Sequence, residues 1–160
     1  MSLAKNLALL FRRDLSRLIQ QVDAFPDDET LWRKLPGITN SAGNLVLHLE
    51  GNLREYIGRQ IGGLPYQRTR PIEFSTTGLP KEELKARLVA LRDAIPVVIG
   101  GLSSEQCQKE YPEQVLEIPL ATEEFLIHLY GHLNWHLGEL DYLRRALSGT
   151  GAMERVGLLP

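Results

Sequence analysis

The sequence predicts an all-α protein built as a four-helix bundle. Two observations carry this prediction: four stretches repeat apolar residues every three or four positions, and segments containing Pro, Gly and Thr separate these stretches. A strong strand pattern is missing as well. Neither an internal repeat nor a domain boundary is visible, so the 160 residues are expected to form one domain, 1–160. The connections are longer than those of a minimal bundle, which favours one or two long crossover loops.

The first two predicted helices cover residues 3–22 and the stretch from about 41 to 58 or 62. The apolar face of the first consists of Leu7, Leu10, Phe11, Leu15, Leu18, Ile19 and Val22. Pro26 and the pair Asp27-Asp28 end it. Asn40 or Ser41 suits the N-cap of the second helix, because either side chain can accept a hydrogen bond from a free backbone N–H. Its apolar set is Leu45, Val46, Leu49, Leu53, Tyr56 and Ile57.

The third helix is predicted from Pro80, which suits a first helical turn, to about Gly100. Pro96 lies inside this helix and is expected to kink or split it. The fourth helix is predicted from Thr122 to Gly149, with acidic residues in its first turn where the helix dipole favours anions.

Three further segments are predicted to lack helix. Residues 63–78 are expected to form a polar loop, and residues 101–121 a second loop with a short extended piece at 115–118. The tail 150–160 has no periodicity and is expected to pack as an arm on a neighbouring surface.

Composition excludes several classes of function. The formal net charge is −2, so there is no basic excess to neutralise phosphates, and nucleic-acid binding has no electrostatic support. Cys107 is the single cysteine, which excludes an internal disulfide. Charged residues near the N-terminus interrupt any signal-peptide-like apolar run, and no window resembles a membrane span. We therefore expect a cytoplasmic protein that binds neither membranes nor nucleic acid.

Three of the four histidines lie four residues apart on the last predicted helix, at positions 128, 132 and 136. Four residues advance a helix by only about 40°, so adjacent pairs project from the same side, one turn apart. This is the spacing at which two imidazoles on one helix reach a single metal ion. The stripe borders the apolar face of the helix, whereas a solvated histidine run would lie among the polar residues of the far side.

His48, on the second predicted helix, is less well placed by periodicity. It lies well off the centre of the apolar arc, and Asn44 and Asn52 share its stripe one turn before and one turn after. This stripe is either an ordinary polar face or the lining of a cleft at the edge of the bundle.

Two segments resemble the DinB/YfiT-like superfamily of metal-dependent helical proteins. The segment from Asn40 to Leu53 looks like the second helix of that superfamily, with its first ligand histidine, and the segment from His128 to Leu140 looks like its fourth. The number and order of the helices also agree. The resemblance implies a four-helix bundle with His48, His132 and His136 as metal ligands and His128 as a pocket residue.

Glu139 departs from the pattern, which usually has glutamine there. Its carboxylate is a candidate acceptor for an imidazole N–H, and a direct bond from Glu139 to the metal would close the site instead. Asn44 and Asn52 are further candidates for the pocket or for contacts behind the ligands.

The resemblance implies a divalent metal, Zn²⁺ or Ni²⁺, in a metal-dependent enzyme of the thiol S-transferase or hydrolase type. The expected substrate is a small molecule, with a low-molecular-weight thiol as a candidate partner, and we expect a homodimer. The alternative is a non-catalytic bundle that is stabilised by a metal or binds a small molecule. Tyr56, Arg68, Arg70 and Trp135 are weaker candidates for the pocket, and each is more simply explained as packing or surface.

Overall fold

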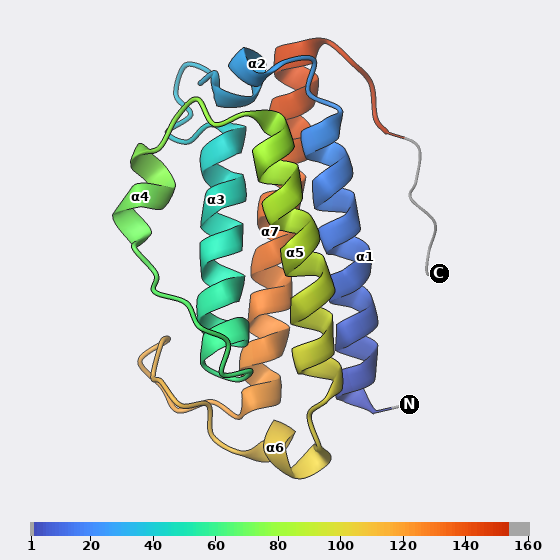
Figure 1. Cartoon of the computed structure of the whole chain (residues 1–160), viewed down its shortest axis with the longest axis vertical. Helices are drawn as coiled ribbons and strands as arrows, with labels where there is room; N and C mark the ends of the chain where they lie inside the picture. Colours follow the sequence, from blue (N-terminus) through green and yellow to red (C-terminus); the bar gives the residue numbers. More distant parts are fainter. Residues whose placement is uncertain (1, 154–160) are drawn as a thin grey trace.

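The computed structural model describes residues 2–153 and consists, over that range, of helices and connecting segments without strands (Figure 1). The long helices are α1 (Leu3–Asp23), α3 (Ala42–Leu53), α5 (Lys81–Gly100) and α7 (Thr122–Ser148). Short helices lie in the connections: α2 (Asp28–Trp32), α4 (Arg70–Ser75) and α6 (Ser104–Gln108). The prediction of an all-α four-helix bundle is confirmed.

The bundle contains one long crossover. In Figure 1, α1 and α7 run upward, whereas α3 and α5 both run downward. The chain therefore has to return from the lower end of α3 to the upper end of α5, and it does so along the outside of the bundle through α4. α1 and α3 each pack against both α5 and α7. α1 and α3 therefore lie at diagonally opposite corners of the bundle.

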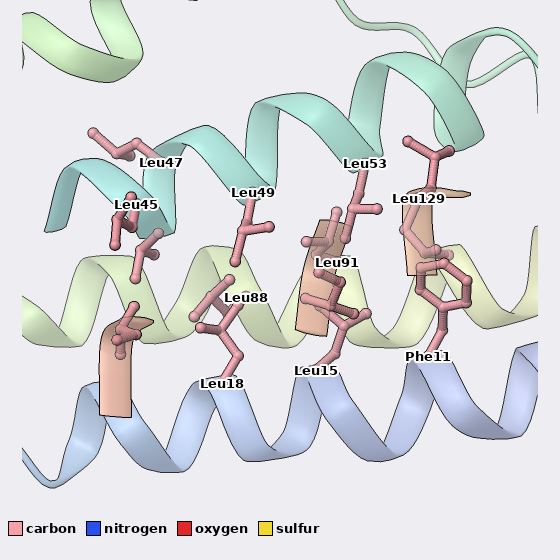
Figure 2. Packing of buried hydrophobic residues seen from close by; sticks show 14 of the residues in the cluster. Phe11, Leu15, Leu18, Leu45, Leu47, Leu49, Leu53, Leu88, Leu91 and Leu129 are labelled. Carbon is pink, nitrogen blue, oxygen red and sulfur yellow. The ribbon is translucent and has the colours of Figure 1, made fainter. Parts of the chain in front are cut away.

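Leucines from all four long helices, together with aromatic side chains, form one buried cluster at the centre (Figure 2). Phe11, Leu15 and Leu18 of α1 face Leu49 and Leu53 of α3 across this core, with Leu88 and Leu91 of α5 beside them. Burial of side chains of this size contributes about 1.5–3 kcal/mol each, which makes the core the main source of stability.

The predicted ends of the long helices agree closely with the structure. Ser41 is the N-cap of α3: its hydroxyl accepts from the backbone N–H of Asn44, and the Asn44 side chain in return bonds the Ser41 backbone. Gly149 ends α7 with φ at 69°, a left-handed conformation that glycine adopts at little cost.

Several predictions about the connections were wrong. The segments 63–78 and 101–121 are not plain loops, since they contain α4 and α6, and α2 lies just beyond the predicted end of the first helix. The extended piece at 115–118 does not form; within residues 2–153 the β-type pairing is a single bridge between Glu110 and Ala121. Helices of five or six residues are too short to display an apolar period, which is why the sequence did not reveal them.

The structure adds detail to two other helix predictions. α5 continues through Pro96, which therefore does not split it. The helix begun by α3 continues to residue 59, but Arg54–Arg59 is a π-helical segment, η1, with wider backbone hydrogen bonds such as the one from Gly62 N to Ile57 O. π-Helical turns within helices are frequent at functional sites.

None of the helices within residues 2–153 combines the length and the apolar character that a membrane crossing requires. The tail 150–160 falls largely outside the described residues, so its role as a packing arm stays a prediction, as does the single-domain boundary 1–160.

Candidate metal centre

The structure brings together three histidines from two helices. His48 projects from α3, and His132 and His136 project from adjacent turns of α7. One ring nitrogen from each histidine lies within 4.8 Å of the others. The Nε2 atom of His132 is 3.2 Å from Nε2 of His48 and 3.2 Å from Nε2 of His136.

These separations suit ligands of one metal ion. A tetrahedral Zn²⁺ with bonds of about 2.0–2.1 Å holds its ligand nitrogens about 3.3–3.4 Å apart. The Nε2 atoms of this cluster are already close to that spacing. They also point toward one another from opposite walls, as ligands of a shared ion must.

In His48 and His136, a hydrogen bond at Nδ1 determines which ring nitrogen carries the proton. Nδ1 of His48 lies 2.9 Å from Oε2 of Glu73, and Nδ1 of His136 lies 2.7 Å from Oε2 of Glu139. An ionised carboxylate only accepts hydrogen bonds, so each Nδ1 carries the proton. In the neutral ring, Nε2 then presents a lone pair to the centre, which is the form that binds a metal.

His132 completes the cluster in a different way. Burial, followed by the neighbouring charges of His136 and His48, lowers the pKa of His132 to about 4. The ring is therefore neutral at pH 7. Its Nδ1 atom is buried and, within residues 2–153, has no hydrogen-bond partner. Its Nε2 atom is the nitrogen that faces the Nε2 atoms of His48 and His136.

Glu73, on α4, is a site residue that the sequence analysis missed. It is buried between α4 and α3 and bonds both His48 and Arg68. Burial alone would raise the pKa of Glu73, but hydrogen bonds from His48 and Arg68 bring it below the ordinary value. The available signal was Pro71 followed by an acidic residue, a pattern typical of a helix start inside the segment that was predicted to be a loop.

Arg68 and Phe74 hold this corner of the centre. The Arg68 guanidinium makes two hydrogen bonds to Glu73, of 2.7 and 2.9 Å, and packs 5.4 Å from the ring centroid of Tyr56. The ring of Phe74 lies 5.1 Å from that of His48. Arg68, named above as a weaker candidate for the pocket, is thus already engaged by a carboxylate of the same chain.

The other candidate residues take varied positions. Glu139 accepts from His136, and its second oxygen accepts from the indole N–H of Trp135, 2.8 Å away. The carboxylate thus faces Nδ1, on the far side of the ring from the converging Nε2 atoms. Trp135 is 70% exposed. His128 is exposed and stacks on Phe125, outside the cluster of three.

Asn44 and Asn52 are both buried but differ in their contacts. The Asn44 amide donates to the backbone oxygens of Glu73 and Thr76, so it ties α4 to α3 rather than facing the cluster. The side-chain oxygen of Asn52, one turn beyond His48, has no hydrogen-bond partner within residues 2–153.

Two hollows each include one residue that contacts a histidine of the cluster, Arg68 in one and Glu139 in the other. A polar cleft of about 530 Å³ includes Tyr56, Arg68 and Arg70 among its lining. A mainly apolar one of about 480 Å³ includes Leu45, Glu139 and Leu143. Both fall in the size range of small-molecule sites.

Fold and site together define a class: a helical bundle with a candidate three-histidine metal centre between two of its long helices. A solved structure of the same architecture is that of a DinB-like protein from Bacillus cereus, to which this chain is similar with a TM-score of 0.66 and 15% sequence identity. The similarity covers 88% of this chain and 91% of that one. The chain therefore has the DinB-like fold, as predicted.

Comparison of the sequence with family models gives no match. The curated proteins likewise contain no significant match to this sequence.

Proposed function

We propose that this protein binds one divalent metal ion through His48, His132 and His136, and that the ion serves a metal-dependent enzyme of the thiol S-transferase or hydrolase type. The observation that carries the proposal is the convergence of three Nε2 atoms, two of them with their rings fixed by carboxylates. Zn²⁺ and Ni²⁺ are the proposed ions, because imidazole suits both.

Three protein ligands leave at least one coordination position open, as in catalytic rather than structural zinc sites. An ion in such a site supplies Lewis acidity, lowering the pKa of a water or thiol that binds at the open position. The residues of this chain hold the ligand rings: Glu73 and Glu139 each keep a proton on Nδ1. Since Glu139 is engaged by His136 and Trp135, it does not close the site as a fourth ligand in this arrangement.

The first test is metal content. Protein purified without nickel resin and reconstituted with Zn²⁺ should retain about one ion per chain after desalting, by elemental analysis. The double variant His132→Ala/His136→Ala should retain none. His128→Ala is the matched control, because this histidine lies on the same helix but outside the cluster. Equal stoichiometry in the double variant and the control would disprove the proposed centre.

The second test separates the reaction types. The zinc-loaded protein is incubated with electrophilic substrates in the presence and absence of low-molecular-weight thiols, and with ester and amide substrates. Turnover that requires the thiol supports a transferase, whereas thiol-independent cleavage supports a hydrolase. If neither occurs although the metal binds, the alternative of a non-catalytic, metal-stabilised or ligand-binding bundle is favoured.

The homodimer, the small-molecule substrate and the thiol partner stay predictions.

A further inference from the structure

α4 is held against α3 mainly by polar contacts. Of its six residues only Glu73 is buried, and Ile72 is 55% exposed. A helix of this length with so little apolar burial has almost no stability of its own. Three contacts attach it to α3: the Glu73 carboxylate on His48, the Asn44 amide on the backbone of Glu73 and Thr76, and the half-buried ring of Phe74 beside the ring of His48.

The surface of α3 is shaped to receive the Glu73 carboxylate. Gly51, three residues after His48, lies directly under it, and a Cβ atom built on Gly51 would fall 2.8 Å from Cδ of Glu73 and closer still to Oε1. Any side chain at position 51 would therefore displace the carboxylate. On the opposite side, the Arg68 guanidinium holds both oxygens of Glu73.

We propose that α4 is a latch on the metal centre: docking of α4 through Glu73 and binding of a metal at His48 strengthen each other. This inference rests on the proposed function. A cation bound at Nε2 of His48 withdraws electron density from the ring and makes Nδ1–H a stronger donor to Glu73. In return, the docked carboxylate fixes the ring orientation and raises the basicity of Nε2. The coupling is reciprocal, because it is a free energy shared by the two events.

The expected strength of this coupling follows from the effect of similar hydrogen bonds in other metal sites. Loss of a hydrogen-bond partner of a metal-ligating histidine typically weakens metal affinity 10–100-fold. By reciprocity, the metal should favour the docked form of α4 by a factor of about 10–100 as well.

Gly51→Ala is the sharpest perturbation, because it adds one methyl group, alters no ligand and displaces only the flexible end of Glu73. Glu73→Gln is the second variant: it keeps the side-chain shape but removes the charge that holds Arg68. Gly138→Ala is the matched control, since it places the same methyl group two residues from His136 on α7, where no atom lies within 4 Å. Circular dichroism verifies that each variant is folded.

Zn²⁺ affinity is measured by competition with a chromophoric chelator. We expect Gly51→Ala and Glu73→Gln to bind about 10–100-fold more weakly than the wild type, and Gly138→Ala to bind as the wild type does. Hydrogen exchange of the amides in α4 is the second readout. Zn²⁺ should slow this exchange about 10–100-fold in the wild type and much less in Gly51→Ala.

α6 provides an internal control for hydrogen exchange, because it is similarly short but lies at the bottom of the bundle in Figure 1, away from α4. Zn²⁺ should leave its exchange nearly unchanged. Unchanged Zn²⁺ affinity in both variants, or equal protection of α4 and α6, would overturn the latch and leave the three-histidine centre standing. If the wild type itself binds no ion, the centre and the latch both fail.

Discussion

At the scale of single residues, His132 is one source of pH-dependent stability in the metal-free protein. Its Nε2 atom lies between those of His48 and His136. Burial and these two neighbours lower the pKa of His132 to about 4, against 6.5 for an ordinary histidine. At any pH well above 4 the ring is therefore neutral, and an incoming cation does not meet a positively charged imidazolium there.

This low pKa predicts that the metal-free protein loses stability toward unfolding as the pH falls. Between pH 6.5 and about 4 the unfolded chain protonates at His132 and the folded chain does not, so stability falls as the pH falls through this window. One such group contributes at most about 1.4 kcal/mol per pH unit. Urea unfolding of the metal-free protein at pH 7, 6, 5 and 4.5 measures the slope. In His132→Gln the slope should be shallower; identical slopes would show that another group controls it.

A second residue-scale prediction concerns Asp14, which is fully buried on α1. Its carboxylate accepts from Arg13, Arg17 and the hydroxyl of Tyr130 on α7. Burial opposes ionisation, but these partners hold the pKa of Asp14 below its ordinary value. Asp14→Ala leaves the partners of a buried ion pair uncompensated and should cost about 3 kcal/mol in urea unfolding.

Tyr130→Phe removes two hydrogen bonds of the same cluster, one donated to Asp14 and one accepted from Arg13, and should cost about 1–2 kcal/mol. Zn²⁺ stoichiometry should be normal in both variants, because none of these residues belongs to the histidine cluster. A cost below 1 kcal/mol for Asp14→Ala would mean that the buried pair makes no net contribution.

At the scale of elements, the glycines of α7 differ in what an added methyl group would do. Gly149 has φ at 69° just beyond the last turn, whereas Gly131 lies inside the helix with open space beside it. Gly149→Ala should therefore destabilise the protein by about 1 kcal/mol. Gly131→Ala should stabilise it by a similar amount, because alanine favours a helix. Thermal unfolding of the two variants tests the pair; a gain in stability for Gly149→Ala would contradict the assigned end of α7.

The sequence predicted best those helices in which apolar residues recur at three- or four-residue steps over several turns. α1 buries Leu7, Phe11, Leu15, Leu18 and Val22 at the predicted spacing, since a long amphipathic helix has no other way to cover its apolar face. α4 lacks such a face, because its docking is polar, and so Glu73 was missed. Pro71 followed by an acidic residue indicates a helix start, but no local pattern indicates that the carboxylate is buried against a distant histidine.

At the scale of the whole molecule, the candidate centre depends on packing of α3 against α7. The spacing within α7 placed His132 and His136 on one side of a helix. Periodicity did not show that His48, 84 residues from His132, faces them; only the resemblance implied it. Its ring is brought to the cluster by the crossover topology, in which α3 lies beside α7 and α4 covers the outer side of α3.

Because the three ligands come from helices that only the folded bundle brings together, metal binding should stabilise the whole fold. The unfolded chain cannot hold an ion with the same affinity, so free Zn²⁺ at 100 times its dissociation constant should raise the free energy of unfolding by about 2.7 kcal/mol. Urea unfolding with and without Zn²⁺ at pH 7 measures this gain, and a chelator should reverse it. In His132→Ala/His136→Ala the gain should disappear, whereas His128→Ala should keep it. A gain of equal size in the double variant would place the stabilising ion elsewhere on the chain.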